Sequence, residues 1–386
     1  MNNFYCYNPT KILFGRNMIE RIPNELAGVE RILLLYGGGS IKRNGVLDKI
    51  REVLQRFELF EFGGVEQNPE YETALKALAY ARNKKIDLIL AVGGGSVADA
   101  AKFLSLAFHH EGEDPWRLVT QEAPPPRQML PVGCIQTLPA SGSEMNNAFV
   151  LSRRELKRKL SFNHIQLFPR FSVLDPETTF SLSPRQTALG IVDIFVHVLE
   201  QYVTSPVFAP LQDRQAEAIL CTVAELAEPL LREPENYDLR ASVMWCACQA
   251  PNGLISRGVP ADWSTHMIGH ELTALYDIPH GQTLALIWGG VMRHQLAFKQ
   301  EKLAQYGRRV WQIVGAEEEV ARQAIDATEA FFARLGVATR ISALGLDAGN
   351  VADEVVRQFS GETFQNLGEG RNIDLDAIRA IICRQA

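Results

Sequence analysis

The chain has 386 residues, a net charge of -6 and an apolar content of 46%. This length provides for two domains or one large domain with ample core, and the composition is that of a soluble globular protein. The negative charge and the lack of a basic run argue against nucleic-acid binding, and no apolar stretch is long enough to span a bilayer. The six cysteines have no metal-binding or disulfide-framework spacing, so we expect reduced thiols and a cytoplasmic location.

The first half of the chain alternates short apolar runs with amphipathic helical segments. This alternation predicts a parallel sheet that is covered on both faces. An extended segment at 11–14 precedes it. The predicted strands are 31–36, the start of a strand-and-helix unit over 59–83, 87–92, 129–134 and 171–174, and the predicted helices include 46–57 and 97–108.

Beyond Asp175 and Pro176 the pattern is helical nearly everywhere, and no convincing strand is found. Ser183 is a plausible N-cap with Pro184 as the first helical residue, which indicates that a new part of the chain begins there. We therefore predict an α/β dinucleotide-binding domain over residues 1–181 and an all-helical metal-binding domain over residues 182–386.

The sequence Gly-Gly-Gly-Ser occurs twice, each time after a predicted strand. In the second copy, the backbone N–H groups of Gly94, Gly95 and Ser96 can approach a phosphate at a helix N-terminus. The copy is not the G-x-G-x-x-G fingerprint, and a tight strand-to-helix turn is the alternative. Asp99, one turn into the helix, either binds a ribose hydroxyl or favours the helix start electrostatically.

The first copy bears on the choice of nicotinamide cofactor. An acidic residue at such a strand end would bind the adenosine ribose and repel a 2′-phosphate, but none is present here. Lys42 and Arg43 follow instead, so the uncrowded, cationic strand end favours NADP(H) over NAD(H). Plain solvation of these two cations is the alternative. The copy comprises Gly37, Gly38, Gly39 and Ser40.

The segment 189–200 is apolar almost all the way round when drawn as a helix, which predicts burial. Asp193, His197 and Glu200 lie on one face of this helix. A buried carboxylate is costly unless it is paired, hydrogen-bonded or bound to a metal. For Asp193 and His197 alone, a hydrogen-bonded pair is the alternative to a metal site.

A second histidine-rich stretch follows some seventy residues later. His266 and His270 are an i, i+4 pair on a predicted helix, and His280 follows a turn with Pro279 and Gly281. Imidazole nitrogens together with one carboxylate oxygen suit a divalent transition metal such as Fe(II) or Zn(II). The two stretches together predict a metal site.

With these motifs in this order, the chain resembles the iron-containing, or group III, alcohol dehydrogenases over essentially its full length. Within that family it is most similar to the NADPH-dependent aldehyde reductases and butanol dehydrogenases. The resemblance implies a parallel-sheet dinucleotide-binding domain followed by an all-helical metal-binding domain, as in dehydroquinate synthase. The motifs that carry it are residues 93–99, 174–176, 189–200, 266–271 and 279–281.

The resemblance also implies roles for individual residues. His270 matches a histidine beside the metal, and it either relays the substrate proton or only packs there. Ser141 stands where the wider family has a longer Thr/Gly run. The implied metal ligands are Asp193, His197, His266 and His280. The implied cofactor contacts are Gly94, Gly95, Ser96 and Asp99 at the diphosphate, Thr137, Leu138 and Ser141 on the nicotinamide side, Asn68 in an N-P motif, and Lys159 near the nicotinamide ribose.

The implied activity is hydride transfer between NADP(H) and primary alcohols or aldehydes such as butanol and butanal, with one Fe(II) or Zn(II) and in a homodimer. A glycerol or polyol dehydrogenase is the nearest alternative. A dehydroquinate-synthase-type lyase is a further one, although the metal-site stretches are poor in the Lys and Arg that it needs. The non-enzymatic alternative is a protein that binds a metal and a nucleotide but is catalytically idle. The ligand set does not choose between iron and zinc.

Overall fold

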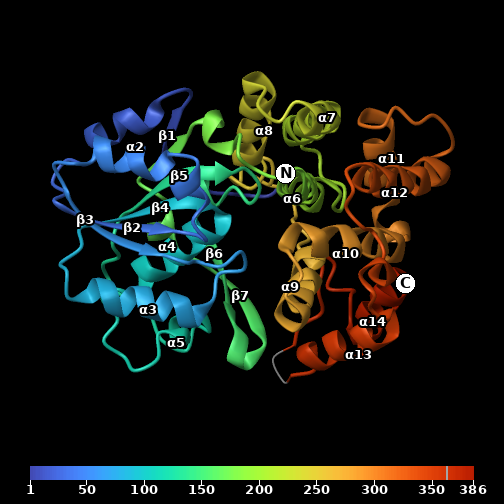
Figure 1. Cartoon of the computed structure of the whole chain (residues 1–386). Coiled ribbons are helices and arrows are strands. Elements are labelled where there is room, and N and C mark those ends of the chain that lie inside the picture. The colour runs from blue at the N-terminus through green and yellow to red at the C-terminus, as the bar shows by residue number, and fades with distance from the viewer. Residues whose placement is uncertain (362–363) are drawn as a thin grey trace. The chain divides into compact units, whose positions relative to one another are not determined.

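The computed structural model describes residues 1–361 and 364–386. By its internal contacts the chain forms two compact units, one of which contains a large β-sheet while the other is helical (Figure 1). We refer to them as the sheet unit and the helical unit. The sheet unit comprises Tyr7–Ser183 and Glu233–Cys248, and the helical unit comprises Met1–Cys6, Pro184–Arg232 and Gln249–Ala386.

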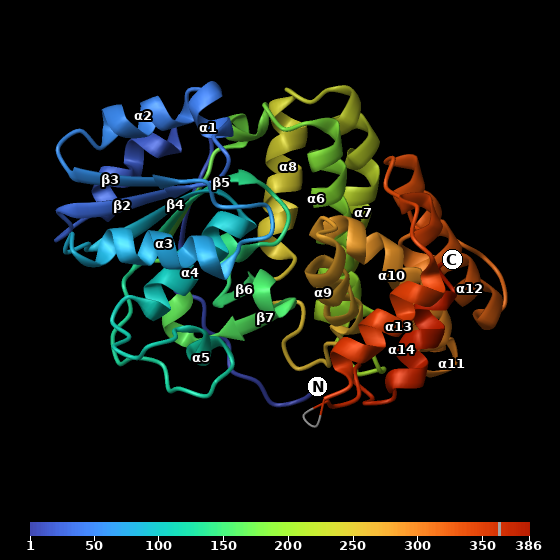
Figure 2. The same ribbon diagram turned by 60° about the horizontal axis from the view of Figure 1, so that its bottom comes forward.

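The sheet has six strands in the order β1-β8-β5-β4-β2-β3, and neighbouring strands pair in parallel. Its strands are β1 (Lys11–Phe14), β2 (Arg31–Tyr36), β3 (Glu58–Gly63), β4 (Leu88–Gly94), β5 (Val132–Leu138) and β8 (Phe171–Leu174). An antiparallel hairpin of β6 (Ala148–Arg153) and β7 (Arg158–Asn163) packs on α4 (Gly95–Ala107) (Figure 2).

The central strands are continuous apolar runs because both faces of the sheet are covered. On β2, Ile32 and Leu34 point to a core formed with η1 (Met18–Glu25) and α2 (Val46–Val53). Leu33 and Leu35 point to the opposite core, formed with α3 (Tyr71–Arg82) and α4. Figure 1 shows α2 on one face of the sheet and α3 and α4 on the other.

Short helices and one long helix complete the sheet unit. The helix α8 follows residue 182 in the sequence, yet up to Cys248 it belongs to the sheet unit, where Met244 and Cys248 pack against Leu174 of β8. The remaining elements are α1 (Ser40–Arg43), α5 (Trp116–Val119), η2 (Ser143–Met145), η3 (Arg154–Leu156), η4 (Ile165–Leu167), η5 (Pro176–Thr179) and α8 (Tyr237–Gln249).

The helical unit is organised around α6 (Pro184–Tyr202), which begins at Pro184 as predicted and is buried from Thr187 to its end. Helices α7 and α10 pack against it. The other helices are α7 (Pro210–Arg232), α9 (Ser264–Tyr276), α10 (His280–His294), α11 (Leu296–Arg309), α12 (Glu317–Arg334), η6 (Ile341–Leu344), α13 (Ala348–Phe359) and α14 (Leu375–Cys383).

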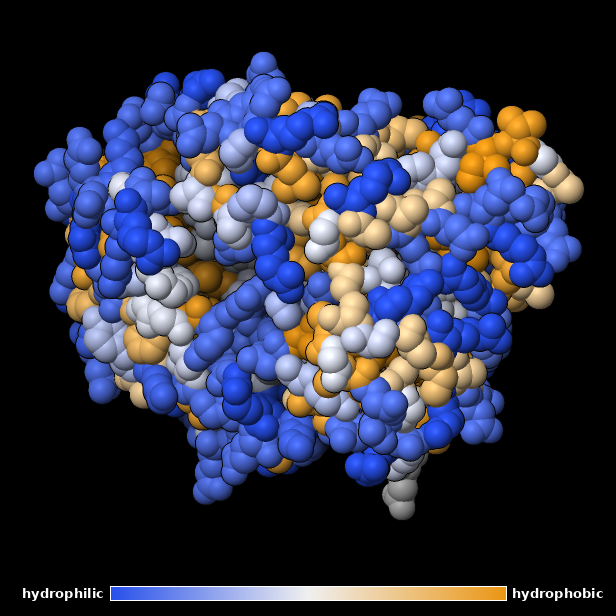
Figure 3. Space-filling model, turned by 45° about the vertical axis from the view of Figure 1, so that its right-hand side comes forward, coloured by the Kyte–Doolittle hydropathy of each residue, from blue (hydrophilic) through white to orange (hydrophobic). Residues whose placement is uncertain are grey.

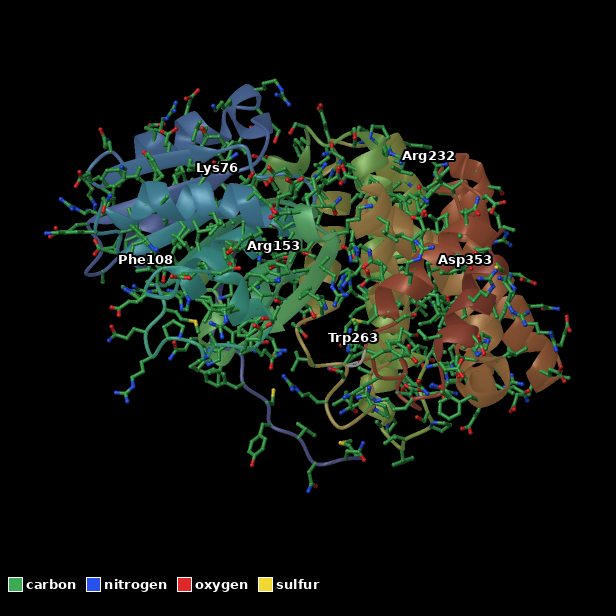
Figure 4. All side chains as sticks on the ribbon, turned by 90° about the horizontal axis from the view of Figure 1, so that it is seen from below. Lys76, Phe108, Arg153, Arg232, Trp263 and Asp353 are labelled. Atoms are coloured by element: carbon green, nitrogen blue, oxygen red, sulfur yellow. The ribbon has the colours of Figure 1, made fainter. Side chains whose placement is uncertain are left out.

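Further features differ from the sequence-based expectation. The strand expected over 129–134 begins at Val132 and runs to Leu138. The helix expected over 46–57 ends at Val53, and the hairpin of β6 and β7 was not predicted. This hairpin is charged around its turn, where Arg153, Arg154 and Glu155 follow one another, and such a sequence lacks the Asn-Gly signal of short hairpins. Arg153 lies at the end of β6 (Figure 4), where its guanidinium pairs with Asp114.

The predicted fold class, a parallel-sheet α/β part followed by an all-helical part, is confirmed. All six cysteines are free thiols. Within residues 1–361 and 364–386, no helix combines the length and apolarity needed to cross a bilayer. On the face in Figure 3, hydrophilic residues predominate and hydrophobic residues lie in smaller groups among them.

Candidate functional site: two glycine loops and a histidine cluster

The two Gly-Gly-Gly-Ser segments lie at the carboxyl ends of neighbouring strands. Strands β2 and β4 pair directly, with Tyr36 opposite Val92. The helix after β2 covers one face of the sheet and the helix after β4 covers the other. This arrangement is a topological switch point, and open α/β sheets bind their ligands outside the carboxyl ends of the strands at such a point.

The second glycine segment is tightly packed. Gly94 is the register partner of Leu138 at the end of β5, and a Cβ on Gly94 would lie 3.1 Å from the Leu138 Cβ. A Cβ on Gly95 would overlap the hydroxymethyl group of Ser141. The structure therefore brings together two loops that the sequence analysis assigned separately to cofactor binding, and a side chain at Gly94 or Gly95 would require these neighbours to shift.

The N-terminus of α4 has the features of an anion site. The helix is 13 residues long, and its N-cap residue, Gly94, gives no side-chain hydrogen bond to the first N–H groups. These groups carry the positive end of the helix dipole, which favours a phosphate. Ser96 donates its hydroxyl to the Gln67 carbonyl oxygen, so this side chain is anchored to the neighbouring loop.

Both carboxylate oxygens of Asp99 accept hydrogen bonds from other residues of the chain. Its Oδ1 accepts a hydrogen bond from the Ser143 hydroxyl at 2.6 Å, and its Oδ2 accepts one from the Val150 N–H at 3.1 Å. Burial raises the pKa of Asp99, while the positive charges of Lys102 and Lys159 pull it down. The carboxylate therefore ties α4 to β6, and its predicted contact with a ribose stays a prediction.

Lys102 was missed by the sequence analysis. This side chain is fully buried, and its Nζ donates to the Ser143 hydroxyl and both Asn146 oxygens at 2.9 Å and to the Ala148 carbonyl at 2.7 Å. Burial lowers the pKa of Lys102 to about 8. A lysine three residues after Asp99 on the same predicted helix was the available signal, and it anchors the loop that follows β5.

The remaining predicted cofactor residues lie in the same unit. Lys159 on β7 is buried, and so are Asn68 and Thr137. Around the first glycine segment there is open space, since a Cβ on Gly38 would meet no atom within 4 Å. The Lys42 ammonium lies 5.0 Å from the centre of the Tyr36 ring, which leaves it at the end of β2, where the sequence analysis placed a 2′-phosphate.

The helical unit brings three of the four predicted metal ligands together. Asp193 lies on α6, His266 on α9, and His280 is the first residue of α10. One potential ligand atom from each lies within 4.8 Å of the other two. These three side chains therefore form a group that can hold a metal ion.

The geometry of this group fits a cation. Asp193 Oδ1 lies 4.0 Å from His266 Nε2 and 3.8 Å from His280 Nε2. His266 Nδ1 is hydrogen-bonded to Glu200. With the proton on Nδ1, the neutral ring presents the lone pair of Nε2 toward the Asp193 carboxylate. A cation between the two atoms would relieve the repulsion of electron pairs that face each other. A carboxylate oxygen with imidazole nitrogens is a donor set for Fe(II) or Zn(II).

His197 lies beside this group in a different arrangement. Its Nδ1 is 2.9 Å from both the main-chain oxygen and Oδ1 of Asp193, and its ring centre is 4.4 Å from that of His266. Burial alone would lower the pKa of His197, but the carboxylates of Asp193 and Glu200 outweigh burial and raise it. The hydrogen-bonded pair and the metal cluster thus share one carboxylate.

His270 lies one turn further along α9. Its ring centre is 5.5 Å from that of His280 and 6.4 Å from that of His266. It is therefore a neighbour of the cluster, and its role in proton transfer stays a prediction. Trp263, at the start of α9 (Figure 4), is also close, with its ring edge-on to His266 at 5.4 Å.

The sequence analysis gave no role to Glu200, although this residue lies on the same helix face as Asp193. It is fully buried and accepts hydrogen bonds from the Thr265 N–H at 2.6 Å and from His266 Nδ1. Burial and the nearby Asp262 carboxylate raise the pKa of Glu200 to about 8, whereas the Thr265 contacts lower it.

A doubly covered parallel sheet with glycine loops at its switch point, in one chain with a helical unit that carries an Asp/His cluster, defines a nucleotide- and metal-binding protein. The chain belongs to the iron-containing alcohol dehydrogenase family. The model of the iron-containing alcohol dehydrogenases matches residues 9–176, and the model of the C-terminal part of the Fe-containing alcohol dehydrogenase family matches residues 187–383. The predicted family is therefore confirmed.

Individual relatives cover the whole chain. It is 46% identical over 383 residues to the NADPH-dependent aldehyde reductase YqhD of Escherichia coli, with 99% of each chain covered. The crystal structure of that protein matches with a TM-score of 0.97 and 45% identity, over 100% of this chain and 99% of the other. The NADH-dependent butanol dehydrogenase A of Thermotoga maritima matches with a TM-score of 0.95 and 31% identity, over 100% and 99%.

Proposed function

We propose that the protein is a metal-dependent alcohol dehydrogenase and aldehyde reductase. It transfers hydride between NADP(H) and primary alcohols or aldehydes such as butanol and butanal, with broad specificity. The observation that carries the proposal is the buried group of Asp193, His266 and His280 in a chain of the iron-containing alcohol dehydrogenase family. The activities named for the E. coli and T. maritima relatives support the substrate class.

The helical unit holds the metal through Asp193, His266 and His280, and we propose His197 as the fourth ligand. When bound, a divalent metal supplies Lewis-acid chemistry that favours negative charge on a carbonyl oxygen, and the dinucleotide supplies the hydride. His270, 6% exposed and next to the group, holds and delivers the proton that aldehyde reduction needs.

The sheet unit binds the dinucleotide. The N-terminus of α4, with Gly94, Gly95 and Ser96, binds the diphosphate, in agreement with its uncapped N–H groups. We propose Asn68, Asp99, Thr137, Leu138, Ser141 and Lys159 as the remaining contacts. The open space at Gly38 and the positive charge of Lys42 support a preference for NADP(H) over NAD(H). The E. coli relative that is 46% identical is named as an NADPH-dependent enzyme, which also supports this preference.

We further propose that the protein is a cytoplasmic homodimer. Six free cysteines are typical of a reducing compartment. Sedimentation at micromolar concentration tests the dimer.

The decisive experiment compares initial rates of butanal reduction with NADPH and with NADH, using apo-protein reloaded separately with Fe(II) and with Zn(II). We expect one butanol for each NADPH consumed, slower turnover with NADH, and no turnover by the apo-protein. Initial rates of glycerol oxidation with NADP⁺ test the alternative of a polyol dehydrogenase. Metal-loaded protein that binds NADPH but consumes none with any aldehyde would refute the proposal and favour a lyase or an idle binding protein.

A further inference from the structure

Glu200 connects two helices of the metal site through both oxygens of one carboxylate. It lies on the last turns of α6, is fully buried, and faces the first turn of α9. One oxygen accepts the backbone N–H of Thr265 at 2.6 Å, and the other accepts Nδ1 of His266. The same side chain therefore fixes the backbone that carries a metal ligand and the ring of that ligand.

The backbone of Glu200 adds a third connection. Its carbonyl oxygen accepts the Asp262 N–H at 2.9 Å, immediately before α9 begins. The Asp262 side chain in turn accepts the Ser264 N–H at 2.9 Å. Lys299 neutralises Asp262 at a distance of 2.9 Å and is itself fully buried. The start of α9 is thus held against α6 by contacts that leave Glu200 directed at His266.

The contact with Glu200 decides which nitrogen of His266 carries the proton. In its ionised form Glu200 only accepts hydrogen bonds, so Nδ1 of His266 is then the N–H, and in the neutral ring Nε2 carries the lone pair. That Nε2 lies 4.0 Å from Asp193 Oδ1, within the group that can hold a metal. A carboxylate on the far side of the ring also makes the imidazole a stronger donor.

We propose that Glu200 is a positioning residue of the metal site, which holds His266 in the tautomer and orientation that present Nε2 to the metal. The inference rests on the proposed function, because it requires that the Asp/His group binds a metal. Glu200 does not touch substrate or cofactor in this assignment, and it acts through His266 alone.

A purely structural role makes a different prediction. If Glu200 only capped the N-terminus of α9 through Thr265, its loss would lower the stability of the fold but leave the affinity for metal unchanged. Glu217 on α7 provides the matched control, since it is also a buried glutamate of the helical unit. It accepts hydrogen bonds from the Tyr202 hydroxyl and from Arg309, both at 2.7 Å.

The test is a titration of the apo-protein with Zn(II) and Co(II), followed by calorimetry and by the visible absorption of Co(II). We expect Glu200→Gln to weaken metal binding by about 10–100-fold and to change the Co(II) spectrum, while Glu217→Gln binds as the wild type does. Equal affinity and an equal spectrum for Glu200→Gln and wild type would overturn the inference. Wild-type protein that binds neither metal would instead refute the proposed metal site.

A second measurement needs no variant at this position and therefore does not depend on its folding. Long-range ¹H–¹⁵N spectra of the metal-free wild-type protein report the tautomer of each histidine, with the His266 signals assigned by their loss in His266→Asn. We expect a proton on Nδ1 of His266 and a lone pair on Nε2. A proton on Nε2 in the neutral ring would overturn the inference even if the metal binds.

Discussion

Gly281, the second residue of α10, lies so close to the backbone carbonyl group of Leu189 on α6 that a Cβ at this position would overlap it. The missing side chain lets the first turn of α10 rest directly on the backbone of α6. His280 precedes Gly281 and is thereby held with its Nε2 3.8 Å from Asp193 Oδ1. The distance between two candidate metal ligands is thus set by a glycine that is not a ligand.

Replacing this glycine should disturb the metal site. Gly281→Ala must push α10 away from α6, which we expect to weaken Zn(II) binding by about 10-fold or more and to destabilise the fold by about 1–3 kcal/mol. Gly290→Ala is the matched control on the same helix, because its Cβ would meet the Ile381 carbonyl oxygen at 2.6 Å. The two variants should lose comparable stability, but only Gly281→Ala should lose affinity for metal in calorimetry.

Asp193 should be required for the metal. In Asp193→Ala the group loses its only carboxylate, so we expect metal content after purification and the rate of butanal reduction to fall by more than about 100-fold. Asp213→Ala, which removes a carboxylate paired with Lys302 at 2.6 Å, should retain both. Retention of metal with a near-normal rate in Asp193→Ala would contradict the ligand assignment.

The end of β2 should decide between the two nicotinamide cofactors. A side chain fits at Gly38, because its Cβ would meet no atom within 4 Å. In Gly38→Asp the new carboxylate should repel a 2′-phosphate, so we expect KM for NADPH to rise by about 10-fold or more while KM for NADH falls or stays constant. Gly38→Asn has the same size without the charge. An equal rise of KM for NADPH in both variants would indicate a steric effect. It would count against a 2′-phosphate at the end of β2.

A buried glutamate outside the site should make stability depend on acid pH. Glu329 binds Arg293 at 2.7 Å and Arg340 at 2.8 Å. Burial opposes ionisation of Glu329, yet these guanidinium groups lower its pKa from 4.5 to about 2. Because the folded-state pKa is depressed, the stabilisation is complete above pH 4.5 and is lost as the pH falls toward 2.

The corresponding variant is Glu329→Gln. We expect a loss of about 3 kcal/mol in the free energy of unfolding at neutral pH, and a difference from wild type that shrinks by about 40% near pH 3.5. Urea denaturation at several pH values measures this. Glu318→Gln removes an exposed partner of Arg322 and should cost less than about 1 kcal/mol. A difference for Glu329→Gln that is independent of pH would mean that its charge does not matter.

Relations within one helix or one turn could be predicted from the sequence. The spacing of Asp193 and His197, and of His266 and His270, follows from the helical repeat, and the glycine segments after strands follow from local turn chemistry. The hairpin of β6 and β7 could not, because its turn has no strong sequence signal and its strands gain their stability by packing on α4.

The sequence by itself therefore determined the order of sheet and helices, the family and the candidate donors, since periodicity and motif are local properties of the chain. Only the tertiary structure decided which donors meet. In the folded protein, His197 pairs with Asp193 and Glu200 is hydrogen-bonded to His266. Lys102 is buried and donates a hydrogen bond to Ser143 in the loop after β5. These contacts join residues that are distant in sequence or depend on the orientation of a side chain. They arise only when whole elements pack against each other, and packing depends on the shapes of all the surfaces at once.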